Sequence, residues 1–374
     1  MTTAAPSYTQ ADLREICAGF AIYGDFLVAV PFGTGHINDT FQVTYDQGGV
    51  RLHYTLQRIN HAVFRKPEQV MENIDRVTGH LLGKIRSRNE ETRKRTIRLL
   101  RTFSNLPYVR DCRGDYWRAY VFVENARSYD VLETPQQAYR AAQAFGEFQC
   151  DLVDLPGARL HETIPDFHNT PKRVEALIEA VDEDRVGRAA GVRREIDFVL
   201  ERREETELLL KLHAEGAIPE RITHNDTKSN NLLIDDLTGS GCCVIDLDTV
   251  MPGLPHYDFG DMVRTGTSPA LEDERDLSKV VMRFGMFEAL LRGYLAGAGN
   301  FLSPLEKSLL PFAGRLITLE TAIRFLTDYL EGDVYFRIHR PEHNLDRCRT
   351  QIALVRSMEE QSDAMQRLTE EMMK

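Results

Sequence analysis

The segment that decides the fold reads Thr223-His224-Asn225-Asp226-Thr227-Lys228-Ser229-Asn230-Asn231-Leu232-Leu233-Ile234-Asp235, and it continues through a turn rich in glycine, serine and threonine to Cys242-Cys243-Val244-Ile245-Asp246-Leu247-Asp248. Two apolar runs, 231–235 and 242–246, flank that turn, and this pattern predicts a β-hairpin. In a simple hairpin, residue 235 would face 242 and residue 231 would face 246. Directly opposed residues have Cβ atoms about 5 Å apart, so we expect Asn231 and Asp246 to lie together at the open end.

The polar residues of this segment are of the types that phosphoryl transfer requires. Asp226 precedes the hairpin on a loop, where its carboxylate could accept the proton of an incoming hydroxyl while Lys228 neutralises phosphate charge. Asn231 and Asp246 offer oxygen ligands of the kind that Mg²⁺ prefers. An aspartate, an asparagine five residues later and a strand-end aspartate about twenty residues on are typical of kinases. A polar loop with an N-capping aspartate explains Asp226 alone, but it does not explain the whole set.

A second candidate for the metal ligand lies further along the chain. Asp258-Phe259-Gly260 spells the tripeptide that carries the metal in protein kinases. It lies too far after Asp226, and it follows a loop rich in proline and glycine instead of a buried strand. We therefore assign the metal to Asp246, and we expect Asp258 and Asp261 to cap and brace the segment that follows them.

The N-terminal part alternates apolar and polar residues, which predicts antiparallel strands over 26–30, 41–45 and 50–59, followed by a helix from Pro67 to about Leu82. Gly33 and Gly35 lie between the first two strands and could bring backbone N–H groups close to phosphates. A plain hairpin turn is the alternative for these glycines taken alone. The third strand lacks the lysine that kinases place there. Arg58 could supply the charge or Gln57 a hydrogen bond, and the sequence does not decide between them.

A further strand, 117–123, ends beside Glu124, whose backbone we expect to bind the adenine of ATP. Beyond residue 134 the chain is mainly helical and ends in one long charged helix over 344–374, and another helix is expected over about 11–24 at the N-terminus. A pair of short strands between 222 and 250 is the single expected interruption. This order predicts an α+β fold with a β-rich nucleotide-binding lobe over 1–123 and a helical catalytic and acceptor-binding lobe over 124–374.

Composition limits the classes of function. The chain has 374 residues and a net charge of −11. That charge argues against a broad nucleic-acid surface, since duplex binding depends on lysine and arginine. The six cysteines form no C-x-x-C pair, which is typical of reduced core cysteines in a cytosolic protein. No segment has the roughly 20 apolar residues of a membrane span, and no signal peptide is recognised. We expect a cytoplasmic protein, most simply a monomer.

Several motifs resemble the aminoglycoside-phosphotransferase-like kinases, and among these the branch of bacterial N-acetylhexosamine 1-kinases. The similarity runs over nearly the whole chain. The 223–249 segment is shared by the wider superfamily, whereas the 324–345 segment is more specific to the branch. The matching motifs are Gly-x-Gly-His-Ile-Asn at 33–38, Phe-His-x-Thr-Pro at 167–171, Thr-His-Asn-Asp-Thr-Lys at 223–228, Ile-Asp-Leu-Asp-Thr at 245–249, Ala-Leu-Glu-Asp-Glu at 270–274, and Arg-Phe-Leu-x-Asp-Tyr-Leu-Glu-Gly-Asp at 324–333.

The resemblance implies a bilobal protein-kinase-like fold. It further implies Mg²⁺- and ATP-dependent phosphorylation of the anomeric hydroxyl of GlcNAc or GalNAc. It assigns the role of general base to Asp226 and the metal site to Asp246. It also implies that His36, Arg324 and Tyr335 bind the sugar together with Asp226. The residues alone favour a different role for Arg324. Carboxylates four residues before and after it, at Glu320 and Asp328, predict an ion-pair ladder along a helix.

Two other functions compete with a sugar kinase. The first keeps the chemistry but takes an amine-bearing alcohol such as choline, homoserine or an aminoglycoside. The acidic balance is compatible with a cationic acceptor, whereas the proposed acceptor pocket, with Arg324, His36 and Tyr335, argues against one. The second is a non-catalytic nucleotide-binding or scaffold protein of the same fold, supported only by the missing lysine.

Overall fold

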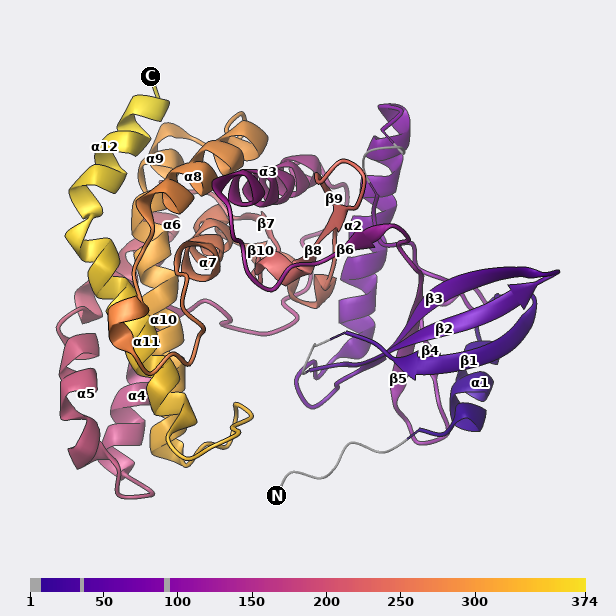
Figure 1. Cartoon of the computed structure of the whole chain (residues 1–374), viewed down its shortest axis with the longest axis horizontal. Coiled ribbons are helices and arrows are strands. Elements are labelled where there is room, and N and C mark those ends of the chain that lie inside the picture. The colour runs from indigo at the N-terminus through magenta and orange to yellow at the C-terminus, as the bar shows by residue number, and fades with distance from the viewer. Residues whose placement is uncertain (1–7, 34–36, 91–94) are drawn as a thin grey trace. The chain divides into compact units, whose positions relative to one another are not determined.

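The structure is a computed structural model that describes residues 8–33, 37–90 and 95–374. Contacts divide the chain into two compact units, one of residues 1–126 with 159–164 and one of residues 127–158 with 165–374. The first unit is rich in strands and the second in helices, as Figure 1 shows, and this confirms the predicted α+β class. Among the described helices, none is long and apolar enough to cross a membrane.

The first unit is built on one antiparallel sheet with the order β1-β2-β3-β5-β4. Its strands are β1 (Asp25–Pro31), β2 (Asp39–Gln47), β3 (Val50–Ile59), β4 (Val109–Arg110) and β5 (Tyr116–Val121). Strand alternation places Val43, Leu56 and Trp117 on one face, where they pack against α1 (Gln10–Ala18). The helix α2 (Pro67–Ser87) follows β3. The predicted strands over 26–30, 41–45 and 50–59 are confirmed. The predicted first helix is too long, because the chain after Ala18 is drawn into an isolated bridge between Phe20 and Thr102.

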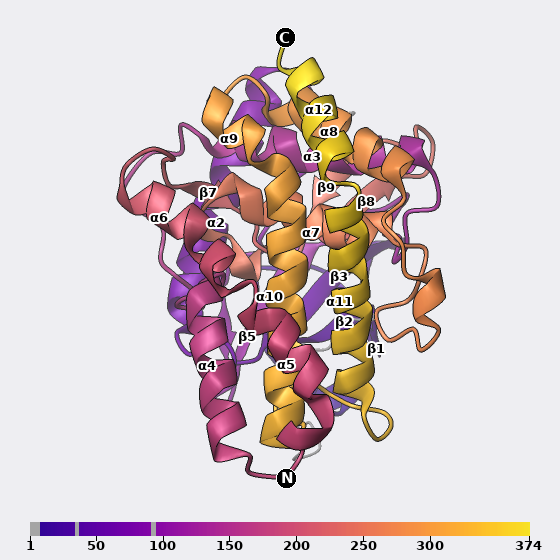
Figure 2. The ribbon, with the colours of Figure 1, turned by 90° about the vertical axis from the view of Figure 1, so that its left-hand side faces the viewer.

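The second unit contains the remaining α-helices and several short strands, and the strand β6 (Ala126–Arg127) spans the division between the two units. Its helices are α3 (Pro135–Leu152), α4 (Thr170–Glu183), α5 (Arg193–Leu200), α6 (Leu208–Ala214), α7 (Pro255–Thr267), α8 (Phe284–Ala298), α9 (Pro304–Ser308), α10 (Leu310–Glu331), α11 (His343–Glu360) and α12 (Ser362–Met372). Figure 2 shows α10 along the middle of this unit, with α11 on one side and α4 on the other. Because α10 is apolar on nearly every face, it contributes to three separate hydrophobic clusters.

Two predictions about the second unit are wrong. The tail is not one helix, because Gln361 leaves helical geometry between α11 and α12 and its side-chain amide donates to the Met282 carbonyl at 2.8 Å. The catalytic region also has two strand pairs instead of one. The hairpin of β8 (Leu232–Asp235) and β9 (Gly241–Val244) is joined by a pairing of β7 (Arg221–Thr223) with β10 (Met251–Gly253). Both extra strands have only three residues, too few to show an alternating pattern.

Candidate active site

The catalytic hairpin forms as predicted, but its register differs. Leu232 pairs with Val244 and Leu233 with Cys243, and a bulge follows before Ile234 pairs with Gly241. The predicted pairs 235–242 and 231–246 are therefore wrong by one residue or more. The turn explains the shift, since the Asp235 carboxylate accepts hydrogen bonds from the backbone of residues 237 and 238 and closes the turn early. The Asn231 carbonyl instead accepts from Ile245 N at 2.9 Å, so Asn231 still lies beside the segment that carries Asp246.

The loop that precedes the hairpin is held by a buried carboxylate. Asp258, in the first turn of α7, accepts hydrogen bonds from the backbone N–H groups of His224 at 2.9 Å and Asn225 at 2.6 Å. The Gln149 side chain donates to the same carboxylate, and Thr227 donates its hydroxyl to the Asp258 carbonyl at 2.6 Å. Asp258 thus braces the catalytic loop before it in sequence, not the segment after it as predicted. Both of its oxygens accept hydrogen bonds from protein groups, and the assignment of the metal to Asp246 instead of Asp258 stays a prediction.

The two residues before Asp226 give the loop its shape. His224 is fully buried between Phe145 and Phe148, and its Nε2 lies 2.9 Å from the Ile245 carbonyl. Its Nδ1 accepts from the Asp226 backbone N–H at 3.3 Å, which assigns the neutral tautomer with the proton on Nε2. Asn225 adopts the left-handed conformation with φ +65°, which asparagine tolerates better than most residues. The histidine thereby joins the loop to the β9 end of the hairpin.

Asp226 is the centre of a small polar cluster. Its carboxylate lies 3.0 Å from the Lys228 ammonium and accepts a hydrogen bond from the Asn231 amide at 3.0 Å. Burial alone would raise the pKa of Asp226, but the charge and hydrogen bond of Lys228 lower it below its ordinary value. The charge of Asp226 in turn raises the pKa of Lys228. The carboxylate is therefore ionised at neutral pH, and the predicted cluster of Asp226, Lys228 and Asn231 does form.

The remaining donor atoms suit a hard cation. Asn231 uses its amide nitrogen on the Asp226 carboxylate and carbonyl, and so turns its amide oxygen the other way. Asp246 lies just after β9. Its side chain is solvent-exposed, and its backbone adopts the left-handed conformation, with φ +58°. Amide and carboxylate oxygens on neighbouring segments fit the oxygen shell of Mg²⁺. No cluster of three or more histidine, cysteine or acidic side chains that could hold a metal occurs in the described ranges.

The predicted nucleotide-binding residues lie in the first unit. Gly33 is left-handed, with φ +83°, and no atom lies within 4 Å of the position that a Cβ would take there. Gly35 and His36 lie outside the described residues. Glu124 faces His53, whose Nδ1 lies 2.7 Å from its carboxylate, and its carbonyl accepts from Arg95. The contact of these residues with a nucleotide stays a prediction.

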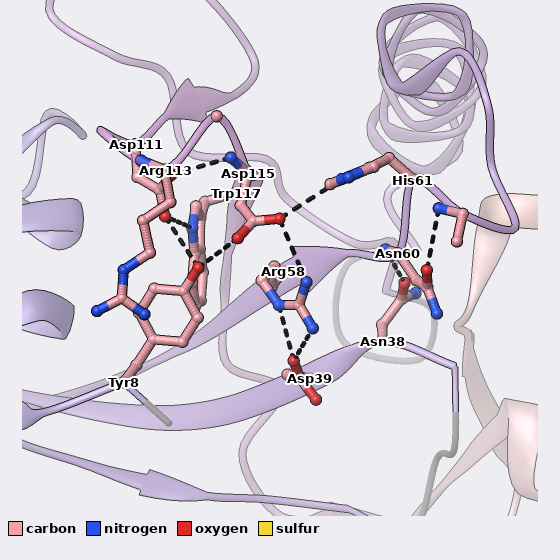
Figure 3. A network of polar contacts seen from close by, with 12 residues as sticks. Tyr8, Asn38, Asp39, Arg58, Asn60, His61, Asp111, Arg113, Asp115 and Trp117 are labelled. Atoms are coloured by element: carbon pink, nitrogen blue, oxygen red, sulfur yellow. Dashed lines mark hydrogen bonds and ion pairs between the residues drawn. The ribbon is translucent and has the colours of Figure 1, made fainter. Parts of the chain in front are cut away.

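Arg58 has partners that the sequence did not reveal. Figure 3 shows its guanidinium between two carboxylates, with Nε 2.7 Å from Asp39 and Nη1 3.3 Å from Asp115. Tyr8 donates its hydroxyl to Asp115 at 2.5 Å in the same network. Gln57 points to the other face of β3, where it accepts from the buried Arg118. The charge of Arg58 is thus largely neutralised by this network, which weakens the case for a phosphate contact.

Arg324, on α10, does not form the predicted ion-pair ladder. Both carboxylates of that ladder have other partners: Glu320 binds His168 and Thr170, and Asp328 accepts the backbone N–H groups of residues 334–336. Arg324 instead lies among aromatic rings, with its guanidinium carbon 6.0 Å from the centre of Tyr335. Asp328 thereby fixes the loop that holds Tyr335 near Arg324.

His168 is a site residue for which no role was predicted from the sequence. Its buried ring has Nδ1 2.8 Å from the Glu320 carboxylate and Nε2 3.1 Å from the Asn225 carbonyl. Both partners can only accept, so both ring nitrogens carry protons and the ring is an imidazolium. Burial alone would lower the pKa of His168, but the Glu320 charge and both hydrogen bonds raise it above its ordinary value. The one signal in the sequence was the position of His168 in the 167–171 motif.

Comparisons with known proteins agree with this fold. A sequence model described as the phosphotransferase enzyme family matches residues 28–299. An aminoglycoside phosphotransferase from Alicyclobacillus acidocaldarius is 14% identical, with a TM-score of 0.58 over 99% of this chain and 98% of that one. Spectinomycin phosphotransferase in complex with ADP and spectinomycin is 13% identical, with a TM-score of 0.55 over 93% and 98%. Choline kinase from Cryptosporidium parvum is 14% identical, with a TM-score of 0.50 over 95% and 97%. These likenesses confirm the predicted protein-kinase-like fold.

The His168–Glu320 pair predicts a pH-dependent stability. Because folding raises the pKa of His168, the protonated ring stabilises the fold fully below about pH 6.5, and this stabilisation is lost as the pH rises through the folded-state pKa. Because folding lowers the pKa of Glu320, its ionised carboxylate stabilises the fold above about pH 4.5, and this stabilisation is lost as the pH falls through the folded-state pKa. His168→Gln should therefore cost about 3 kcal/mol between these values and less at alkaline pH, as measured by urea unfolding. His161→Gln is the matched control, because His161 pairs with Glu72 at an exposed site, where about 0.5 kcal/mol is expected. Equal effects of the two variants at every pH would contradict the assignment.

Proposed function

The chain belongs to the phosphotransferase enzyme family, and we propose that it transfers the terminal phosphate of ATP to the anomeric hydroxyl of an N-acetylhexosamine, giving the sugar 1-phosphate. The observation that carries the transfer chemistry is the cluster of Asp226, Lys228 and Asn231 on a loop braced by Asp258. A nucleotide co-substrate is supported by the similar spectinomycin phosphotransferase, whose structure contains ADP. The N-acetylhexosamine rests on the resemblance of the 324–345 segment to one branch of the family.

Asp226 would accept the proton of the sugar hydroxyl as the new O–P bond forms. Because its pKa is lowered, it is ionised and ready at neutral pH, and it acts more by orienting the hydroxyl than by basic strength. Lys228, half-exposed beside it, would move from this carboxylate toward the negative charge of the transferred phosphoryl group. Asn231 holds the carboxylate in place through its amide hydrogen bond.

The Asn231 amide oxygen and the Asp246 carboxylate would hold Mg²⁺, which neutralises charge on the phosphates when it is bound. The left-handed backbone at Asp246 turns the carboxylate out of the strand β9 and into solvent. Aspartate adopts this conformation at little cost, so the site needs no strained residue. We propose Gly33 and Gly35 as phosphate-loop residues and the backbone at Glu124 as the adenine contact. Arg58 stays a candidate only if phosphate displaces one of its carboxylates.

Arg324 favours a sugar over an amine-bearing acceptor. Its positive charge has no ion-pair partner among the described residues, since Glu320 and Asp328 bind elsewhere. An ammonium group placed beside it would be repelled. We propose that Arg324, Tyr335 and His36 hold the sugar, with an arginine N–H fork and an aromatic ring suited to hydroxyl and carbonyl oxygens. The aminoglycoside and choline kinases among the similar structures keep a cationic acceptor as the second candidate.

Replacing the proposed base tests the chemistry. Asp226→Asn preserves shape but removes the proton acceptor, so kcat should fall by about 10²–10⁴-fold, with a small change in KM for ATP. Asp236→Asn is the matched control, because Asp236 lies in the turn of the same hairpin and is bonded only at the surface to Arg127. A near-normal kcat for Asp226→Asn would show that another group accepts the proton.

Replacing the proposed metal ligand tests the role of Asp246. Asp246→Asn tolerates the left-handed backbone, whereas alanine would add strain. The loss of charge should raise the Mg²⁺ concentration for half-maximal activity by about tenfold or more, because carboxylate charge sets cation affinity. Circular dichroism should stay unchanged, since the side chain is exposed. An unaltered Mg²⁺ titration would refute this ligand.

A substrate panel identifies the acceptor. GlcNAc, GalNAc, choline, homoserine and kanamycin are incubated with Mg-ATP, and phosphorus NMR locates the phosphorylated atom. We expect turnover of the N-acetylhexosamines, with phosphate on C1. Phosphate on C6 would overturn the 1-kinase assignment, and turnover of choline, homoserine or kanamycin alone would establish the second candidate. Nucleotide binding without transfer to any acceptor would favour a non-catalytic protein.

A further inference from the structure

Two arginines of the second unit both contact Phe167: Arg173 donates to its carbonyl, and Arg324 lies over its ring. Most of their N–H donors have no acceptor among the described residues. We propose that Arg173 and Arg324 form a binding site for a carboxylate carried by the acceptor, so that the acceptor is an acidic derivative of an N-acetylhexosamine. This inference rests on the proposed function, because it places the acceptor beside α10, and it goes beyond that function by adding a charged group and a second arginine to the site.

Arg324 is an arginine without a hydrogen-bond acceptor. Within residues 8–33, 37–90 and 95–374 it makes no hydrogen bond and no ion pair. Its neighbours are three rings, whose centres lie 5.7 Å (Phe167), 6.0 Å (Tyr335) and 5.4 Å (Phe336) from the guanidinium carbon. Rings attract the cation, but no oxygen or nitrogen atom of the described residues accepts its N–H groups. The rings therefore hold the guanidinium in place, while its five N–H donors stay available to a ligand.

Arg173, on α4, supplies the second guanidinium. Its Nη2 donates to the carbonyls of Asp166 at 3.3 Å and Phe167 at 3.0 Å, which fixes the group in place. Its Nε is buried and has no hydrogen-bond partner in the part of the chain that the structure describes, although a buried donor without a partner costs about 1–3 kcal/mol. Burial lowers the pKa of Arg173, and the charge of Arg324 lowers it further. A ligand that accepts from Nε and carries negative charge would remove both penalties.

The charges around this pair do not neutralise it. His168 is an imidazolium, and Glu320, which bonds to it, has both oxygens occupied by His168 and Thr170. Asp166 is paired with Lys172 at 2.6 Å. Three positive groups, Arg173, Arg324 and His168, thus lie near Glu320, whose carboxylate bonds to His168. The charges of Asp166 and Asp261 also act on this group, on Arg173 and on His168 respectively.

The chemistry of the pair selects the class of ligand. Guanidinium groups bind carboxylates through two parallel N–H···O bonds, with charge assistance. A neutral N-acyl carbonyl could accept from one guanidinium but would leave the charge of the other unopposed. An ammonium would be repelled by both. A carboxylate can accept N–H groups from both guanidiniums and offsets one of their two charges, and the hydroxyl to be phosphorylated must be on the same small molecule.

The test compares two sugars that differ by one carboxylate. N-acetylglucosamine and its 3-O-lactyl ether, N-acetylmuramic acid, are assayed with Mg-ATP and the full-length chain. We expect the KM of the acidic sugar to be about tenfold lower or more, and Arg324→Met to raise it by about 10–100-fold, the value of a charge-assisted hydrogen bond. The KM of the neutral sugar should rise less. Arg173→Met should act in the same direction. Arg185→Met is the control, because Arg185 is exposed and paired with Glu183.

Binding without nucleotide separates this inference from the proposed function. In thermal unfolding, N-acetylmuramic acid should stabilise the wild-type chain and the Arg185→Met variant but not Arg324→Met. Stabilisation with no turnover of either sugar would refute the sugar kinase and keep the carboxylate site. Equal KM values for the two sugars, or equal stabilisation of wild type and Arg324→Met by the acid, would overturn the carboxylate site and leave the sugar kinase standing.

Discussion

The loop that carries the proposed base, Asp226, depends on the Asp258 carboxylate. Two backbone N–H groups that precede Asp226 point inward and have no strand partner, and a buried carboxylate is the acceptor that can satisfy both at once. This contact lets the chain turn sharply, with Asn225 in the left-handed conformation, so that Asp226 faces Lys228 and Asn231. The position of the proposed base thus follows from a hydrogen-bonding requirement of the backbone.

The helix α10 has two roles that compete for its surface. Most of its residues fill the hydrophobic clusters of the second unit, yet one stripe carries Glu320, Arg324 and Asp328. Each of the two carboxylates fixes a loop, Glu320 through His168 and Asp328 through the backbone of residues 334–336. The arginine between them gains no partner from either. A rigid, buried helix thereby positions the residues proposed to bind the acceptor, and it reaches the catalytic loop through His168 and the Asn225 carbonyl.

The sequence predicted what depends on local pattern and missed what depends on tertiary partners. The strands of the first sheet followed from alternation, and the cluster around Asp226 from the spacing of its residues. The hairpin register failed because the Asp235 side chain closes the turn early and a bulge follows. Asp258 and Arg58 were both noticed, but their partners lie 33 and 57 residues away in the chain. Helical spacing wrongly predicted that Glu320 and Asp328 pair with Arg324, because both carboxylates bind groups on other segments of the chain.

The unpaired arginine also bears on how the fold selects an acceptor. The transfer chemistry near Asp226 needs only a hydroxyl and is indifferent to what the rest of the molecule carries. At the proposed acceptor site, discrimination would come from α4, α10 and the 334–336 loop, where Arg173 and Arg324 carry donors and positive charge. Binding energy gained there would orient the hydroxyl at the base and so contribute to rate as well as affinity. Members of one family that share the braced loop can therefore differ in acceptor through a few residues on one helix, since a change at position 324 leaves the Asp258 contacts untouched.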